Sequence, residues 1–480
     1  MSERPQQTRF TALLVAVTAL VGCVSPARIA ELGAEEATKV EQSMGILGDA
    51  EIERYVAAIG HKLAAVSDRP QGPWKFQIVD TPEPNAFALP GGYIYVSRGL
   101  LALVNSEDEL AGVIGHEIGH VTAAHVERRI RASVMTSPVS IASGLAGLAT
   151  GILSPSLGRM VSSSGQALQT GLVIAPYGRA QENEADRIGQ TLAARAGYDP
   201  AGISNFLHTL EREVALLGDQ PRERGFLRTH PITADRIAKT QERSPSLARM
   251  PGQSIARDRA DLFARLEGIV VGADPAHGVI RDNVAIHPEL DIAITFPVGW
   301  PLANTRQAVG AASPEKDALL VATVAERNTS LDALLAKLER EQSGLGFERF
   351  YIRDLPAART QMSDRNRFIA LTLIEYRGDV YSLLGQSAAS SAARYNKLFD
   401  STDRSFRALN AGEWQSLEET RLRIRQARAG QTAAAVMEHT GSSWSAEQIA
   451  VANAIDAEQP LGAGQLLKVG IPQAYTPRNR

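Results

Sequence analysis

The stretch His116-Glu117-Ile118-Gly119-His120 holds two histidines four residues apart in a segment that is predicted to be helical. On a helix such side chains share one face, so both imidazoles can bind one metal ion, and their nitrogens suit zinc. Glu117 leaves the same turn at a different angle, where it can contact a water on the metal. Zinc lowers the pKa of that water from about 15.7 toward 7, and a carboxylate can then accept its proton. The stretch therefore predicts a zinc site with Glu117 as general base, rather than two surface histidines on an amphipathic helix.

The helix that carries this stretch has a recognisable start. Ser106 and Glu109 form a capping box, so we expect the helix to begin near Glu107 and to run to about Arg131. His125 lies nine residues after the first histidine of the motif, which is about 900° of helix, so we expect it to point to the opposite side. It is interpreted as a surface or packing residue.

A third metal ligand must come from another segment. The metzincin pattern would need Gly at 123 and His at 126, but the chain has Ala123 and Val126. Residues 182–186 read ENEAD, in which Glu182 and Asp186 share a face of a predicted helix and Glu184 is rotated by about 200° from Glu182. Glu182 can bind the metal, and Asp186 can accept a hydrogen bond from the outer nitrogen of a ligating histidine. The alternative for this segment alone is a solvated acidic helix end.

The composition limits the other possibilities. The chain has 480 residues, with 44% hydrophobic and 21% charged residues and a formal charge of −3, which fits two to four globular domains. This charge gives no general attraction to nucleic acid or acidic lipid. The single cysteine, Cys23, excludes an intramolecular disulfide and a cysteine-based cluster, so a metal site must use histidines and carboxylates.

Residues 1–22 are typical of a secretory signal peptide. The apolar run from Phe10 to Gly22 is too short for the roughly 20 residues of a membrane-spanning helix. It ends in LVGC, which resembles a bacterial lipobox and implies that Cys23 is the lipidated first residue of the mature chain. The absence of Asp directly after Cys23 favours the outer membrane. The alternative is an ordinary signal peptide with an incidental cysteine.

The rest of the chain predicts an α+β protein with several units. Residues 74–79 alternate like a strand, and residues 86–96 read as a hairpin turning at Pro90-Gly91-Gly92. Residues 134–175 are rich in Gly, Ala and Ser, and we expect buried or substrate-facing helices there rather than a membrane span. The fold class is therefore a mainly helical domain with a small sheet, followed by an α/β accessory domain and a small terminal unit.

Four segments together resemble the zinc metallopeptidases of the CAAX-prenyl-protease, HtpX and BepA type, a gluzincin family. They are HEIGH at 116–120, ENEAD at 182–186, NAFALPGGYIYV at 85–96 and THPITADRI at 229–237, and the resemblance covers about residues 40–245. It implies one zinc ion per chain, bound by His116, His120 and Glu182. It also implies that the hairpin lies beside the cleft, where an extended substrate could pair with a strand edge formed by Asn85, Ala86, Phe87 and Ala88.

The fourth segment adds two residues whose roles the resemblance only outlines. His230 precedes Pro231, so its backbone is expected to be extended and outside the following helix. By the resemblance, His230 and Arg236 lie close to the active site and are assigned as catalytic, either in oxyanion stabilisation or in gating, with His230 able to occupy the open zinc position at rest. His230 could equally be a structural residue.

The C-terminal half carries no catalytic constellation. Residues 280–410 loosely resemble the α/β domains of the PsbP or Mog1 type, through FPVGW at 296–300 and a late Ser405-Phe406-Arg407. Residues 415–480 weakly resemble a LysM module, although the usual Pro and Asp at its start are missing; the alternative is a small accessory α+β domain. The expected layout is a signal peptide at 1–22, a metallopeptidase domain at 23–255 and these two units.

Together these features predict a zinc endopeptidase in the bacterial periplasm, tethered through lipidated Cys23 to the outer membrane. Its expected substrates are misfolded or misassembled envelope proteins, with peptidoglycan as a further partner of the LysM-like unit. Two alternatives remain open. One is a cell-wall-binding scaffold or chaperone with a vestigial peptidase role, and the other is a hydrolase of peptidoglycan peptides.

Overall fold

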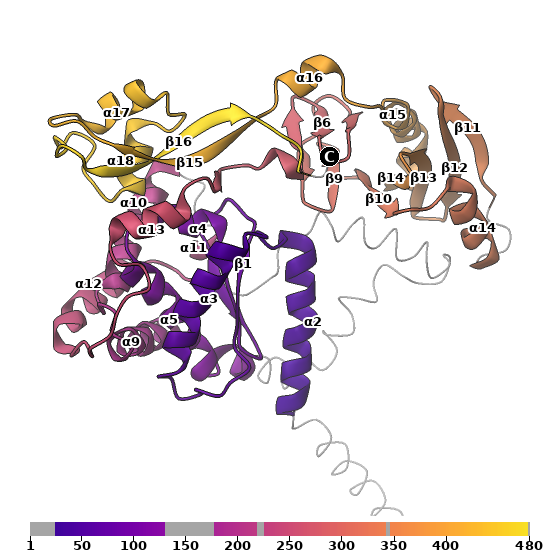
Figure 1. Ribbon diagram of the computed structural model, residues 1–480. Helices are drawn as coiled ribbons and strands as arrows, with labels where there is room; N and C mark the ends of the chain where they lie inside the picture. Colours follow the sequence, from indigo (N-terminus) through magenta and orange to yellow (C-terminus); the bar gives the residue numbers. More distant parts are fainter. Residues whose placement is uncertain (1–24, 130–176, 218–224, 342–345, 479–480) are drawn as a thin grey trace, which may run out of the picture. The chain divides into compact units, whose positions relative to one another are not determined.

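The computed structural model describes residues 25–129, 177–217, 225–341 and 346–478, which form two compact units (Figure 1). The first unit combines the described residues up to 272 with residues 420–472, and the second contains residues 273–419 and 473–478. Residues 1–22, Cys23 and the segment 134–175 lie outside the described residues. In the described parts of the chain, no helix has both the length and the apolar character that crossing a membrane requires.

Helices dominate the first unit. They are α2 (Pro26–Met44), α3 (Ala50–Ala64), α4 (Arg98–Leu103), α5 (Glu107–Thr122), α9 (Arg179–Arg195), α10 (Gly202–Leu217), α11 (Phe226–Thr229), α12 (Ala234–Arg243), α13 (Arg259–Leu266), α17 (Ala433–Thr440) and α18 (Ala446–Ala452). One small sheet has the order β1 (Lys75–Val79), β3 (Tyr93–Ser97), β2 (Ala86–Leu89), with β1 parallel and β2 antiparallel to β3. The expected strand and hairpin are therefore confirmed.

The buried helix α5 is the centre of this unit. Its N-cap is Ser106, whose hydroxyl accepts a hydrogen bond from Glu109 N at 3.1 Å, as expected from the sequence. We expected the helix to run to about Arg131, but α5 ends at Thr122. Ala124 adopts a left-handed backbone with φ 53°, which interrupts the helix. The chain therefore changes direction directly after the second histidine of the motif.

Glycines bring α9 unusually close to α5. A Cβ added to Gly119 would lie 2.9 Å from Ala185 O, and one added to Gly189 would lie 2.7 Å from His116 N. These distances are shorter than a carbon atom tolerates, so only glycine permits this backbone contact. The close packing places the acidic segment of α9 beside the histidines of α5.

The C-terminal residues 420–472 belong to the first unit. Strand β15 (Glu418–Gln426) pairs with β4 (Val270–Val271) and with β16 (Leu466–Ala474), and α18 packs against α4 and α10. Leu422 and Ala452 are part of the main core, which also includes residues of α3 and α5. The segment predicted as a LysM-like unit at 415–480 thus shares a core with the peptidase-like part of the chain.

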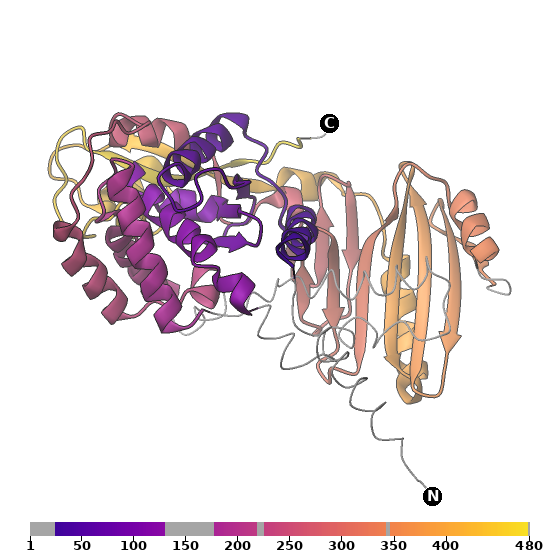
Figure 2. The same ribbon diagram turned by 90° about the horizontal axis from the view of Figure 1, so that it is seen from below.

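The second unit is built on an antiparallel sheet of seven strands with a helix on each face (Figure 2). Along β13 (Arg367–Tyr376), Phe368 and Ala370 share a core with α15 (Ala392–Arg404), whereas Ile369 and Leu371 share one with α14 (Leu331–Glu341). This alternation is the period of two that a strand imposes. The strand order is β11 (Glu348–Ile352), β12 (Leu355–Ser363), β13, β14 (Asp379–Ala388), β10 (Ala318–Glu326), β9 (Ala308–Ala312), β8 (Leu302–Asn304).

A smaller sheet completes the second unit. Its order is β5 (Val279–Arg281), β6 (Val284–His287), β7 (Ile292–Thr295), and the short helix α16 (Ala411–Gln415) follows α15 in the chain. The mixture of helices and sheets in both units is consistent with the expected α+β class.

Candidate metal centre

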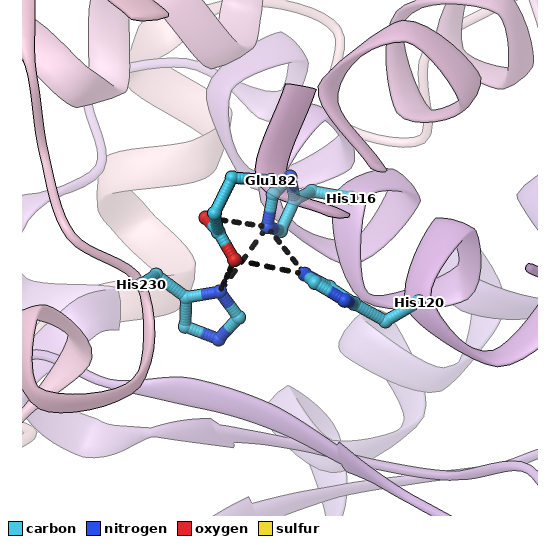
Figure 3. A group of neighbouring side chains, drawn as sticks. All are labelled: His116, His120, Glu182 and His230. Carbon is cyan, nitrogen blue, oxygen red and sulfur yellow. Dashed lines mark hydrogen bonds and ion pairs between the residues drawn. The ribbon is translucent and has the colours of Figure 1, made fainter. Parts of the chain in front are cut away.

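Four side chains from three segments converge on one point in the first unit (Figure 3). His116 and His120 come from α5, Glu182 from α9, and His230 directly follows α11. One nitrogen or oxygen of each lies within 4.8 Å of the others, and all four residues are at most 1% exposed. The structure thus brings together the three expected ligands and adds His230 to them.

The distances describe a compact donor set. His116 Nε2 lies 3.0 Å from His120 Nε2, and Glu182 Oε1 lies 3.3 Å from His120 Nε2. The Nδ1 atom of His230 lies 3.0 Å from Glu182 Oε1 and 3.3 Å from His116 Nε2. Three imidazole nitrogens and one carboxylate at such spacing are a donor set that suits zinc.

The charges of His120 and Glu182 fit a cation. Burial lowers the pKa of His120 well below its usual value, so its imidazole is neutral, as a metal ligand must be. Burial acts to raise the pKa of Glu182, but the neighbouring His230, His120 and His116 outweigh it and hold that pKa below its usual range. Glu182 is therefore an ionised carboxylate among imidazoles. The residues present fit a bound zinc ion.

Glu117 is fully buried next to this donor set. Neither carboxylate oxygen has a hydrogen-bond partner among the described residues, and Oε1 lies 3.4 Å from His230 Nε2. Burial raises the pKa of Glu117. A buried carboxylate without a partner is costly unless it meets a proton, a water or a cation. This is the environment in which a carboxylate acts as a base.

Asp186 and Arg236 support the ligands from the outer side. His116 Nδ1 lies 2.8 Å from Asp186 Oδ1, so its Nε2 is left for the metal. The guanidinium of Arg236 donates to both oxygens of Asp186 at 2.9 and 2.8 Å, and its Nη1 lies 2.6 Å from Glu182 Oε2. Burial acts to raise the pKa of Asp186, but Arg236 outweighs it and lowers that pKa to about 2. Arg236 is thus a brace for two carboxylates in this structure.

His125 does not point away from the site. Its Nδ1 lies 2.9 Å from His120 Nδ1, its Nε2 lies 3.1 Å from Glu184 Oε2, and the residue is fully buried. We expected His125 to point away from the metal-binding face, and this is wrong. The expectation assumed a continuous helix, but α5 ends at Thr122, before His125. Glu184, which the helical rotation directs away from Glu182, meets His125 there.

Two aromatic residues that no sequence motif indicates also line the donor set. The Tyr177 ring stacks on the His120 imidazole with centroids 3.8 Å apart, and Phe226 stacks on His230 at 4.3 Å. Burial raises the pKa of Tyr177 above its usual value. Neither residue stands in a motif, although each lies close in sequence to a segment that carries a ligand. Each ring packs against one histidine of the donor set.

Strand β2, which contains most of the expected substrate edge, lies at one side of the small sheet. Ala86, Phe87 and Ala88 pair with β3 on one side, and no other described strand pairs with their outer side. Asn85 immediately precedes the strand, and its carbonyl accepts a hydrogen bond from Ser97 N at 2.7 Å. Helix α5 packs against β2, so the strand lies next to the helix that carries the histidines.

Part of the first unit is similar to known peptidases. Residues 50–244 match the model of Peptidase family M48. The chain is 29% identical over 237 residues to the beta-barrel assembly-enhancing protease of Yersinia pestis, a match that covers 49% of this chain and 47% of that one. It is 28% identical over 224 residues to the protein of the same name from Escherichia coli strain K12, covering 47% and 45%.

A mitochondrial relative also matches part of the chain. The mitochondrial metalloendopeptidase OMA1 of Schizosaccharomyces pombe is 33% identical over 210 residues, which is 44% of this chain and 56% of that one. The chain thus spans about half the length of the curated relatives it matches. The solution structure of cyanobacterial PsbP from Synechocystis sp. PCC 6803 aligns with 29% of this chain and 98% of its own, at 13% identity and a TM-score of 0.22. That score is too low to support a conclusion about the fold.

Proposed function

We propose that the chain is a zinc-dependent endopeptidase of the gluzincin type, since residues 50–244 match the model of Peptidase family M48. The observation that carries the proposal is the buried set His116, His120 and Glu182 next to Glu117, a carboxylate with no hydrogen-bond partner among the described residues. A scaffold has no need to bury a carboxylate without a hydrogen bond beside a metal-binding cluster, because doing so costs stability.

Each residue then has a role in peptide hydrolysis. A zinc ion held by these residues would act as a Lewis acid: it would polarise the peptide carbonyl and make a water at the site more acidic. Glu117 takes the proton of the attacking water and passes it to the leaving amine, a task for which its raised pKa suits it. Asp186 fixes the ring of His116, and Arg236 holds Asp186 and Glu182 in place. The edge of β2 that pairs with no described strand would receive the substrate main chain at Asn85–Ala88.

The position of His230 favours the gating role over oxyanion stabilisation. Its Nδ1 is within 3.3 Å of both Glu182 and His116, so it belongs to the donor set itself. A histidine there fills the position that a substrate carbonyl needs, since a catalytic zinc keeps one position open. On this proposal, His230 withdraws when substrate enters, and the short segment 225–230 moves with it.

The substrate proposal follows from the named relatives. Two of them are beta-barrel assembly-enhancing proteases, which supports a role in protein quality control of the envelope. We propose misfolded or misassembled envelope proteins as substrates, a periplasmic location, and attachment to the outer membrane through lipidated Cys23. Peptidoglycan binding by residues 415–480 is a separate proposal. Pull-down on purified peptidoglycan tests it, and it fails if deletion of those residues leaves binding unchanged.

Zinc content and proteolysis measured together test the enzymatic proposal. We expect about one zinc per chain and cleavage of a casein-like substrate that a chelator abolishes and added zinc restores. Glu117→Gln is expected to keep its zinc and to lose activity by at least about 100-fold, because it removes the general base. Full activity of Glu117→Gln would refute the mechanism.

A further inference from the structure

The second motif histidine has an unusual partner at its outer nitrogen. His120 Nδ1 faces the Nδ1 of another histidine, His125, at 2.9 Å, and no carboxylate contact with this nitrogen is recorded among the described residues. The other nitrogen of His125 lies 3.1 Å from Glu184 Oε2, at a side chain that is 42% exposed. By contrast, His116 Nδ1 faces Asp186 directly, within the buried ion pair with Arg236.

The direction of the hydrogen bonds in this chain follows from the carboxylate. An ionised Glu184 can only accept, so the proton on the far side of His125 is on Nε2. A neutral His125 then has a lone pair on Nδ1, which accepts from the Nδ1–H of His120. The Nε2 lone pair of His120 is consequently free and directed at the donor set. If His120 Nδ1 accepted this hydrogen bond instead of donating it, the proton of His120 would be on Nε2 and would block a metal there.

We propose that His125 and Glu184 form a relay that positions His120 for zinc, by fixing its tautomer and its ring orientation. The inference rests on the proposed function and extends it to two positioning residues outside the ligand set. The turn at Ala124, with its left-handed φ of 53°, directs His125 back onto His120. Tyr177 stacks on the face of the His120 ring with centroids 3.8 Å apart, and His125 contacts the edge of that ring. Together they restrict the rotation of the His120 imidazole. Partners of this kind typically contribute 10- to 100-fold to metal affinity.

Zinc affinity of the full chain, measured by competition with a chromogenic chelator, tests the relay. His125→Leu removes the acceptor and is expected to weaken zinc binding by about 10- to 100-fold. His125→Asn keeps an oxygen near the position of Nδ1 and is expected to recover most of that loss. Glu184→Gln keeps an acceptor oxygen for His125 and is expected to bind zinc within about threefold of wild type. His208→Leu, at a histidine that is 46% exposed on α10, is the control and should change nothing.

The outcomes separate positioning from packing. Zinc binding by His125→Leu at wild-type strength would overturn the relay, and so would an Asn variant as weak as the Leu variant. If His125→Leu does not fold, His125→Gln replaces it, because its amide reaches toward Glu184 and leaves no acceptor at the Nδ1 position. In that case equal zinc affinity of the Gln and Asn variants would overturn the relay. Failure of the wild type to bind zinc would refute the proposed function instead.

Discussion

At the scale of the residue, the centre is a group of buried polar side chains whose positions define one another. Glu182 is shared by His120, His230 and Arg236, so no one of these contacts can be altered alone. Such networks are expensive to bury and are stable only when their members are satisfied. His230 is the member with a proposed movement, which makes it the residue to test.

His230→Ala is expected to raise the initial rate of hydrolysis of an unfolded substrate, because it removes the side chain that shares the donor position. The rate with zinc bound is the measurement, and His208→Ala is the control at an exposed histidine. A fall of about 100- to 1,000-fold in kcat would contradict gating and support oxyanion stabilisation by His230.

At the scale of the element, the distance between α5 and α9 decides whether a site forms. Gly115 and Gly119 on α5 face α9, and Gly189 on α9 faces the backbone of His116. The ligand spacing along α5 follows from helix periodicity, and the capping box at Ser106 and Glu109 marks where that helix begins. The end of α5 could not be inferred in the same way, because Ala124 adopts a backbone conformation that its residue type does not favour.

Gly189→Ala is expected to lower the free energy of unfolding by about 1–3 kcal/mol and to weaken zinc binding, since its methyl group would push α9 and Glu182 away from α5. Urea unfolding and chelator competition measure the two effects. Gly462→Ala is the matched control, because its Cβ would meet only Gln465 Oε1 at 3.8 Å. An unchanged zinc affinity in Gly189→Ala would mean that the site tolerates a wider spacing of the helices.

At the scale of the whole molecule, the C-terminal segment completes the peptidase unit. Lys468 of β16 is fully buried and donates to the carbonyls of Ala102 and Val104 at 2.8 Å each, immediately before α5. Asn453 in turn holds the backbone of Lys468 through two hydrogen bonds of 2.8 Å. Residues more than 350 positions apart are thus joined next to the helix that carries the zinc ligands.

Lys468→Ala is expected to lower the free energy of unfolding of the zinc-binding unit by about 2–4 kcal/mol. The substitution leaves a cavity, and it leaves two carbonyls without their hydrogen-bond donor. Thermal unfolding with and without zinc identifies that transition, since a ligand stabilises only the unit that binds it. Lys39→Ala, at a side chain that is 62% exposed, serves as the control. If Lys468→Ala leaves the midpoint temperature of the zinc-dependent transition unchanged, residues 420–472 are an independent module.

The sequence alone predicted a metal centre of histidines and carboxylates. Helix periodicity pairs His116 with His120, and Glu182 with Asp186, on one face each, and the family resemblance joined the two pairs into one expected ligand set. The strand and hairpin at 75–97 and the alternating strands of the second unit were equally local patterns.

The contacts between residues far apart in the sequence became visible only in the folded chain. His125 reaches His120 because helix α5 ends early, and Tyr177 stacks on His120 although no motif marks it. The resemblance placed Arg236 near the site, but only the packing of α12 on α9 shows that it braces Asp186 and Glu182. Lys468 joins the same unit from the far end of the chain. These contacts depend on the path of the backbone through the turns and the close glycine packing, and local periodicity carries no information about that path.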